Sequence, residues 1–191
     1  MHKTRLEAFS DAVVAVIITI MVLEIKVPVG TDFSALQPLI PVFISYVLSF
    51  VFIGIYWNNH HHLMQAAEKI NGAILWANLH LLFWLSLIPF LTGWMGENDF
   101  ATLPVALYGV DLLMAGCAYF ILAHLLIAHH GKDSILAKAL GNDKKGKISI
   151  LLYAIAIPLA FYYAWASYLL YIIVAVIWLI PDRRIENILP K

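Results

Sequence analysis

The sequence predicts an all-α integral membrane protein, and three features support this fold class. Hydrophobic residues make up 62% of the 191 residues, and charged residues only 13%. The mean hydropathy is +0.84, and a soluble domain with such a composition would expose a large apolar surface to water. The third feature is a series of long apolar segments bounded by polar residues, which is typical of helices that cross a bilayer.

The first four apolar segments are each long enough for one membrane-spanning helix. We predict these helices at about residues 5–27, 36–64, 73–95 and 103–130. Pro38 and Pro41 lie near the start of the second segment, where a missing backbone N–H is tolerated. The single Cys117 excludes a disulfide framework or a cysteine-rich metal site within one chain.

The last apolar segment, residues 148–180, contains no charged residue. As one helix it would be about 50 Å long, whereas the hydrocarbon core of a bilayer is about 30 Å thick. We therefore predict two shorter helices, at about 147–163 and 166–180, with a break near Tyr162 to Ser167. The aromatic residues at that break suit a membrane interface. The whole chain, residues 1–191, is then a single six-helix domain.

An even number of spans puts both chain ends on the same side of the membrane. Of the 12 Lys and Arg residues, only Lys26 falls on the other side. Basic loops face the cytoplasm, so we predict a multi-pass protein of the cytoplasmic membrane with both termini inside and the acidic loop 97–99 outside. The basic residues on the terminal side are Lys3, Arg5, Lys69, Lys132, Lys138, Lys144, Lys145, Lys147, Arg183, Arg184 and Lys191.

Several classes of function find little support in the sequence. It contains no H-E-x-x-H, G-x-S-x-G or Walker motif, so no enzyme is predicted. The formal net charge of zero argues against nucleic acid as a partner. His60, His61 and His62 are consecutive, so on a helix they point about 100° apart and cannot all bind one ion. We predict no metal and no cofactor.

Three alternative functions are each suggested by a few residues. Asp111 and Pro158 offer thin support for a proton-coupled secondary transporter, although Asp111 is more simply explained by snorkelling or an interhelical hydrogen bond. His80 and His124 could ligate a haem in a membrane oxidoreductase. Residues 92–96 superficially resemble the TVGYG potassium filter, but they end a full span and do not form a re-entrant loop.

The apolar part of the first helix contains one polar side chain, Thr19. At about 100° per residue, one face of this helix carries Ala12, Val16, Thr19, Ile20, Leu23 and Val27. This face could line a narrow path, with a hydroxyl ring between apolar constrictions. Alternatively the helix is simply packed, and the Thr19 hydroxyl binds the carbonyl four residues earlier in its own helix. The chemistry of this segment alone favours this second interpretation. Glu24 lies at the edge of the face and either concentrates cations or is a solvated helix-end charge.

Polar residues gather at the predicted cytoplasmic ends of the first three helices. Asp11 lies about 140° around the helix from Val16, so it should anchor the side opposite the shared face. Partners at matching depth occur on the second and third helices, where either Asn71 or Asn78 could take part. We predict a structural network made of Arg5, Ser10, Asp11, Trp57, His60, His61 and Asn78.

Several sequence motifs point to one family. They are R-x-x-x-F-S-D at Arg5 to Asp11, I-T at Ile18 and Thr19, V-L-E-I-K-V-P at Val22 to Pro28, W-x-x-H-H at Trp57 to His61, and Asn78 and Pro89 in the third helix. This pattern resembles the prokaryotic branch of the transmembrane protein 175 potassium channels, and the resemblance covers the whole chain.

The resemblance implies a homotetramer whose first helices line a central pore without a TVGYG filter. It implies an apolar constriction at Val16, Ile20 and Leu23, and a hydroxyl ring at Thr19. Because the family usually has the larger Ile or Leu at the position of Val16, the pore would be wider than usual at that residue. It also implies that the R-x-x-x-F-S-D residues hold the helix in place. Because the resemblance and the helical face agree, we predict a potassium-permeable leak channel that works by passive electrodiffusion and gates by dewetting. Its partners would be potassium ions, the lipid bilayer and further copies of the chain.

Overall fold

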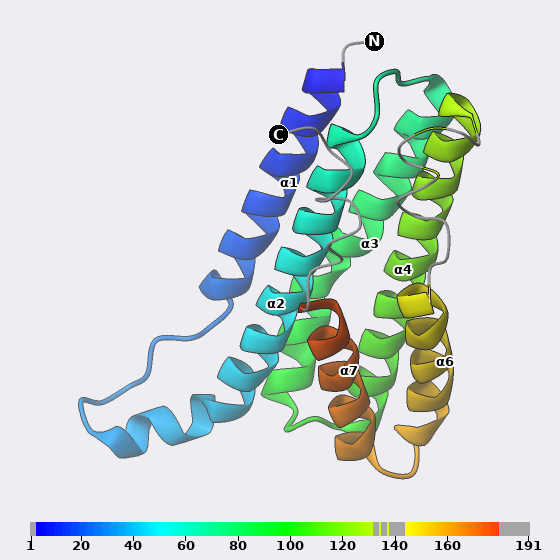
Figure 1. Ribbon diagram of the computed structural model, residues 1–191. Coiled ribbons are helices and arrows are strands. Elements are labelled where there is room, and N and C mark those ends of the chain that lie inside the picture. Colours follow the sequence, from blue (N-terminus) through cyan, green and yellow to red (C-terminus); the bar gives the residue numbers. More distant parts are fainter. Residues whose placement is uncertain (1–2, 132–133, 135–136, 138–143, 180–191) are drawn as a thin grey trace.

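The computed structural model describes residues 3–131, 134, 137 and 144–179, and every regular element among them is helical (Figure 1). All six predicted helices are present, so the all-α fold class is confirmed. They are α1 (Lys3–Leu23), α2 (Ile40–Gln65), α3 (Gly72–Glu97), α4 (Thr102–His130), α6 (Lys144–Leu159) and α7 (Ala164–Leu179), with a 3₁₀ helix, η1 (Phe33–Leu39), before α2. Five basic residues used above to orient the chain, at positions 132, 138, 183, 184 and 191, lie outside the described residues, as does residue 180 of the last predicted helix.

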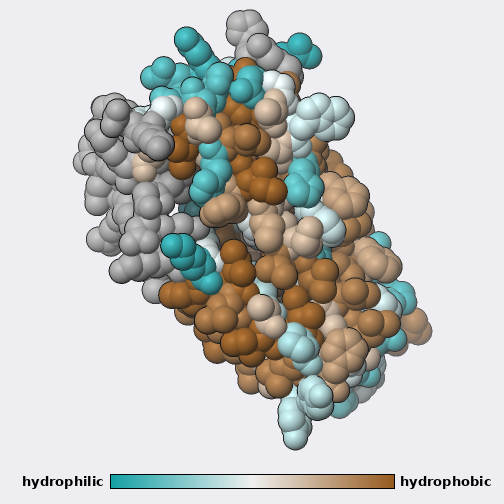
Figure 2. All heavy atoms as spheres, turned by 90° about the vertical axis from the view of Figure 1, so that its right-hand side faces the viewer, coloured by the Kyte–Doolittle hydropathy of each residue, from teal (hydrophilic) through white to brown (hydrophobic). Residues whose placement is uncertain are grey.

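Within the described part of the chain, four helical segments are long and apolar enough to cross a membrane: α1, η1 together with α2, α3 and α4. The helices α6 and α7 have 16 residues each, or about 24 Å, and Figure 1 shows that α6 begins and α7 ends part-way along the bundle. Figure 2 shows that hydrophobic residues cover most of one face of the molecule, whereas hydrophilic residues gather at the end where α1 begins. The chain is therefore a multi-pass integral membrane protein.

Helix α3 lies at the centre of the packing. It contacts α1, α2 and α4, while α6 and α7 pack on each other and on α4. Helix α1 lies at one edge of the bundle and packs against α3 and α2 (Figure 1). This edge position leaves one long side of α1 without a neighbour among the described elements.

Close contact between α2 and α3 depends on a glycine. A Cβ atom on Gly96 would lie 2.6 Å from both the Val42 Cα and the Ser45 Oγ. The Ser45 hydroxyl also donates to the Thr92 carbonyl at 3.1 Å, and the Ser49 and Thr92 hydroxyls are 2.6 Å apart. Small and hydroxylated residues at a helix crossing allow backbones to approach closely and to be joined by hydrogen bonds in lipid.

The first helix is shorter than predicted. It ends at Leu23, not near residue 27, so Val27 does not continue the helical face. Two backbone bonds close the last turn, from Glu24 and Ile25, after which Lys26 turns to Glu97. Pro28 contributes to this early end because it lacks an N–H and disfavours helical backbone at the residue before it.

Two other predicted boundaries also differ from the structure. The second helix was predicted from residue 36 as one α-helix, but residues 33–39 form the 3₁₀ helix that contains Pro38. The break between the last two helices comes earlier than predicted, at residues 160–163, so α6 ends at residue 159 and not 163. Tyr162 and Tyr163 are exposed at this turn.

Candidate functional site: the first helix and its anchors

Helix α1 has two distinct faces. One face is buried against α2 and α3 and carries Leu6, Ser10, Val14, Ile17 and Met21. The other carries the predicted constriction residues, of which Val16 is 54% exposed, Ile20 41% and Leu23 80%. These three apolar side chains are exposed because no other described element covers them. The structure therefore leaves the predicted face of α1 open.

A groove of about 710 Å³ runs between α1 and α3 beside this open face. Its walls are mostly apolar, and two carboxylate residues, Glu24 and Glu97, line it at the end where α1 stops. The other lining residues are Phe9, Ala12, Val13, Val16, Ile17, Ile20, Ser86, Pro89, Phe90, Gly93 and Trp94.

The Thr19 side chain lies on the open face. Its hydroxyl donates to the Val16 carbonyl at 2.8 Å, which lies three residues earlier and not four. The bond to the helix's own backbone, which was the alternative to a pore role, is therefore present. Because the hydroxyl proton is used in this bond, the oxygen lone pairs remain available, and these are the groups that could face a cation.

Charged residues surround the end of α1. Lys26 and Glu97 form an ion pair with Nζ and Oε1 2.7 Å apart, and this contact raises the pKa of Lys26. With Glu24 and Asp99 they line a second cavity of about 420 Å³. The single lysine offsets only one of the three carboxylates, so the electrostatic potential at this end is negative.

A buried chain of hydrogen bonds joins α1 to α3 and α2. Ser10 donates to the Leu6 carbonyl at 2.9 Å and accepts a bond from the Asn78 Nδ2 at 2.9 Å. The Asn78 Oδ1 lies 2.7 Å from the His60 Nε2, which must be the donor because Oδ1 can only accept. All three side chains are buried, with Asn78 at 0% exposure. These bonds fix both the depth and the rotation of α1.

A second anchor lies nearer the surface. The indole Nε1 of Trp57 donates to the Asp11 Oδ1 at 3.0 Å, and the His61 ring stacks on Trp57 with centroids 6.0 Å apart.

Arg5 is exposed, and within residues 3–131 it forms no hydrogen bond or ion pair. The structure thus brings together six of the seven predicted network residues and leaves out Arg5. Asn71 instead caps α3 by accepting a bond from the Ile74 N–H.

Comparisons with known proteins place this arrangement in a family. The sequence model described as "Endosomal/lysosomal potassium channel TMEM175" matches residues 5–89. A potassium channel of Chryseobacterium sp. (strain P1-3) is 54% identical over 191 residues, which are 100% of both chains. The chain belongs to the TMEM175 family. The resemblance inferred from the sequence motifs is therefore confirmed.

Two further TMEM175 relatives extend this result. The crystal structure of a lysosomal potassium-selective channel TMEM175 homolog from Chamaesiphon minutus has a TM-score of 0.80 and 28% sequence identity, covering 94% of this chain and 97% of that one. The human endosomal/lysosomal proton channel TMEM175 is 34% identical over 86 residues, which are 39% of this chain and 17% of the human protein. The TMEM175 fold is that of a channel and not of an enzyme, as the sequence predicted.

The residues that suggested a haem protein or a potassium filter make other contacts in the structure. His80 accepts a bond from the Trp84 indole at 2.9 Å, and the His124 Nδ1 lies 2.9 Å from the Phe120 carbonyl of its own helix. Among the described residues no group of three or more His, Cys, Asp or Glu side chains could hold a metal ion. The stretch 92–96 is part of the helix α3 and not a loop.

Asp111 departs from both arrangements suggested by the sequence. It is 2% exposed and therefore does not snorkel, and neither carboxylate oxygen has a hydrogen-bond partner within the described part of the chain.

Sequence reasoning also missed the cluster of Ser45, Ser49, Thr92 and Tyr108 in the core of this TMEM175 chain. Hydroxyl residues spaced along apolar helices were the available signal for that cluster.

Proposed function

We propose that four copies of the chain assemble around a central pore lined by α1, and that this pore conducts potassium ions by passive electrodiffusion. The observation that carries the proposal is the contrast between the two faces of α1. One face is hydrogen-bonded to α2 and α3, and the other leaves Val16, Ile20 and Leu23 uncovered. A helix that lines a pore needs a fixed rotation and a free face, and α1 has both. The names of the Chryseobacterium and Chamaesiphon relatives favour potassium as the permeant ion.

The open face suggests how conduction would be controlled. Rings of Val16, Ile20 and Leu23 would form apolar constrictions, which close a pore by expelling water when it narrows. A small rotation or splaying of α1 would then open it, so the pore would act as a leak channel. Four Thr19 oxygens would offer lone pairs to a passing cation. Such a ring discriminates among cations less strictly than a cage of carbonyl groups, so we expect a modest preference for potassium over sodium.

The charge distribution suggests an orientation in the cytoplasmic membrane. Lys3 and Lys69 lie at the end where α1 begins, and Lys26 lies at the opposite end among acidic residues. By the positive-inside rule, the first of these ends faces the cytoplasm together with both termini. Glu24 then lies near the outer mouth, where a negative potential raises the local concentration of cations.

Flux of potassium and sodium through purified protein in liposomes tests the proposal. We expect voltage-driven, non-saturating flux that is larger for potassium than for sodium. Flux that saturates and follows a proton gradient would instead support the transporter alternative based on Asp111. Because the human relative is named a proton channel, proton flux is measured in parallel.

Replacement of Thr19 by Val tests the hydroxyl ring. Valine has nearly the same shape but no oxygen, so the preference for potassium should fall while flux persists. The measurement is the reversal potential in mixed potassium and sodium salts. A reversal potential equal to that of the unmodified protein would remove Thr19 from the ion path.

A further inference from the structure

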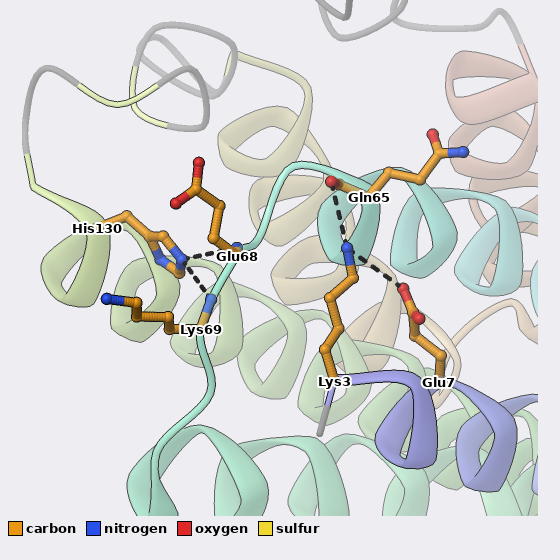
Figure 3. Close-up of polar contacts among 6 residues, drawn as sticks. All are labelled: Lys3, Glu7, Gln65, Glu68, Lys69 and His130. Atoms are coloured by element: carbon orange, nitrogen blue, oxygen red, sulfur yellow. Dashed lines mark hydrogen bonds and ion pairs between the residues drawn. The ribbon is translucent and has the colours of Figure 1, made fainter. Parts of the chain in front are cut away.

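A histidine at the end of α4 holds the segment that connects α2 to α3. This linker, residues 66–71, has no regular structure beyond a turn at its start. The His130 Nε2 lies 2.9 Å from the backbone nitrogen of Glu68 and 3.1 Å from that of Lys69 (Figure 3). The other ring nitrogen, Nδ1, lies 2.8 Å from the Leu126 carbonyl of α4.

These partners determine the protonation state of the ring. A backbone N–H can only donate, so Nε2 must accept both bonds and carries no hydrogen. A carbonyl can only accept, so Nδ1 must carry the hydrogen. His130 is therefore neutral in this arrangement. A proton added to Nε2 would point at two N–H groups and would break both bonds at once.

The titratable groups near the His130 ring among the described residues are His129, Glu68 and Lys69. The neighbouring His129 also accepts, because the Asn71 Nδ2 lies 3.3 Å from its Nδ1 while the Asn71 oxygen is occupied by the Ile74 N–H. The charged side chains on the linker are Glu68 and Lys69, and neither forms an ion pair with His130 within the described residues. Lys69 would oppose a positive charge on the His130 ring and Glu68 would favour one, so these two side chains act in opposite directions.

The linker also lies close to the start of the proposed pore helix. Lys3 of α1 donates to the carbonyl of Gln65, the last residue of α2, at 3.4 Å and lies 3.8 Å from the Glu7 carboxylate (Figure 3). The two amides that His130 holds thus lie three and four residues beyond the carbonyl that contacts α1. A change in how the linker is held therefore occurs next to the first turn of α1.

We propose that His130 is a pH-sensitive clasp that holds the α2–α3 linker when neutral and releases it when protonated. The sign follows from the bonds, since the held state excludes a proton from Nε2. The held state is thus favoured at high pH and is lost when Nε2 gains a proton as the pH falls.

Hydrogen exchange of the linker amides tests the clasp. The full-length protein in lipid nanodiscs is compared at about pH 8 and pH 5, with exchange rates corrected for the intrinsic effect of pH. We expect the protection factors of the Glu68 and Lys69 amides to fall about tenfold at the lower pH, because each loses its acceptor. Protection that does not change with pH would overturn the proposal.

Two variants separate His130 from other titrating groups. His130→Gln places a non-titrating acceptor oxygen near the position of Nε2, so linker protection should become independent of pH. His124→Gln is the matched control, because His124 makes the same type of bond to its own helix and no bond to the linker. It should respond to pH as the unmodified protein does. An unchanged pH response in His130→Gln would overturn the assignment.

The ring tautomer provides a test that needs no variant. Nitrogen NMR of the protein labelled at histidine distinguishes Nδ1–H from Nε2–H. At high pH the His130 signal should be that of the Nδ1–H form, and it should change to the doubly protonated form together with the loss of amide protection. An Nε2–H form at high pH would contradict the clasp, since that nitrogen could not accept the two bonds.

Discussion

Replacement of Asn78 by Leu probes the bonds that fix α1. Leucine is similar in size and has no polar atoms, so the substitution removes the bonds to Ser10 and His60 and leaves the packing of α3 nearly intact. Each lost bond contributes about 0.5–1.5 kcal/mol, and the buried His60 N–H left without an acceptor costs about 1–3 kcal/mol. Interhelical hydrogen bonds in membranes lie at the low end of such ranges, near about 0.6 kcal/mol each. We therefore expect the free energy of unfolding to fall by about 2–3 kcal/mol.

The assay is reversible denaturant unfolding in mixed micelles, with a double-mutant cycle. Ser10→Ala removes the partner on α1, and the cycle with Asn78→Leu should give a coupling energy of about 1 kcal/mol. Ser86→Ala is the control, because this exposed serine on α3 bonds only to its own helix. The reasoning is refuted if Asn78→Leu is no more destabilising than this control. Additive effects of the two network substitutions would equally refute it, since residues in contact through a hydrogen bond are coupled.

Two further predictions concern packing and charge. Gly96→Ala should lower the free energy of unfolding by about 1–3 kcal/mol, because its Cβ would meet the Val42 backbone. Gly93→Ala is the control, because its Cβ would lie in open space, and it should leave the free energy of unfolding unchanged or higher. Equal effects of the two substitutions would contradict the close α2–α3 contact. Lys26→Met should raise potassium flux at low ionic strength and not at high salt, because it leaves Glu97 unneutralised at the proposed outer mouth. Since the contact raises the pKa of Lys26, the lysine keeps its charge until the pH rises to that raised value, so the effect of the substitution should be the same at about pH 6 and pH 8.

Composition and apolar length were sufficient to predict the helical fold. Each long apolar segment became a helix because backbone polar groups in lipid must be paired within the segment. The ends of the helices were less predictable. The first helix ends at Leu23, and besides the local effect of Pro28, Lys26 reaches Glu97, a residue about seventy positions away. No local pattern reveals such a contact.

The candidate site was predictable where helical periodicity applies. Spacing alone put Val16, Ile20 and Leu23 on one face, and the structure leaves that face open. The choice between Asn71 and Asn78 depended on tertiary geometry, because both lie at a suitable depth and only Asn78 faces Ser10. The clasp at His130 was likewise hidden from the sequence, since it joins a helix end to a loop 61 and 62 residues away.

The central claim is that the open face of α1 lines an ion path, and a pair of substitutions tests it most directly. Ile20→Ala widens the proposed constriction, whereas Val22→Ala removes the same kind of apolar volume at the same depth, from an exposed side chain about 160° around the helix. Potassium flux into liposomes is measured for both. The account predicts a clear increase for Ile20→Ala and flux equal to the unmodified protein for Val22→Ala. Equal flux from both variants would contradict it, because the face would then have no special relation to the path of the ion.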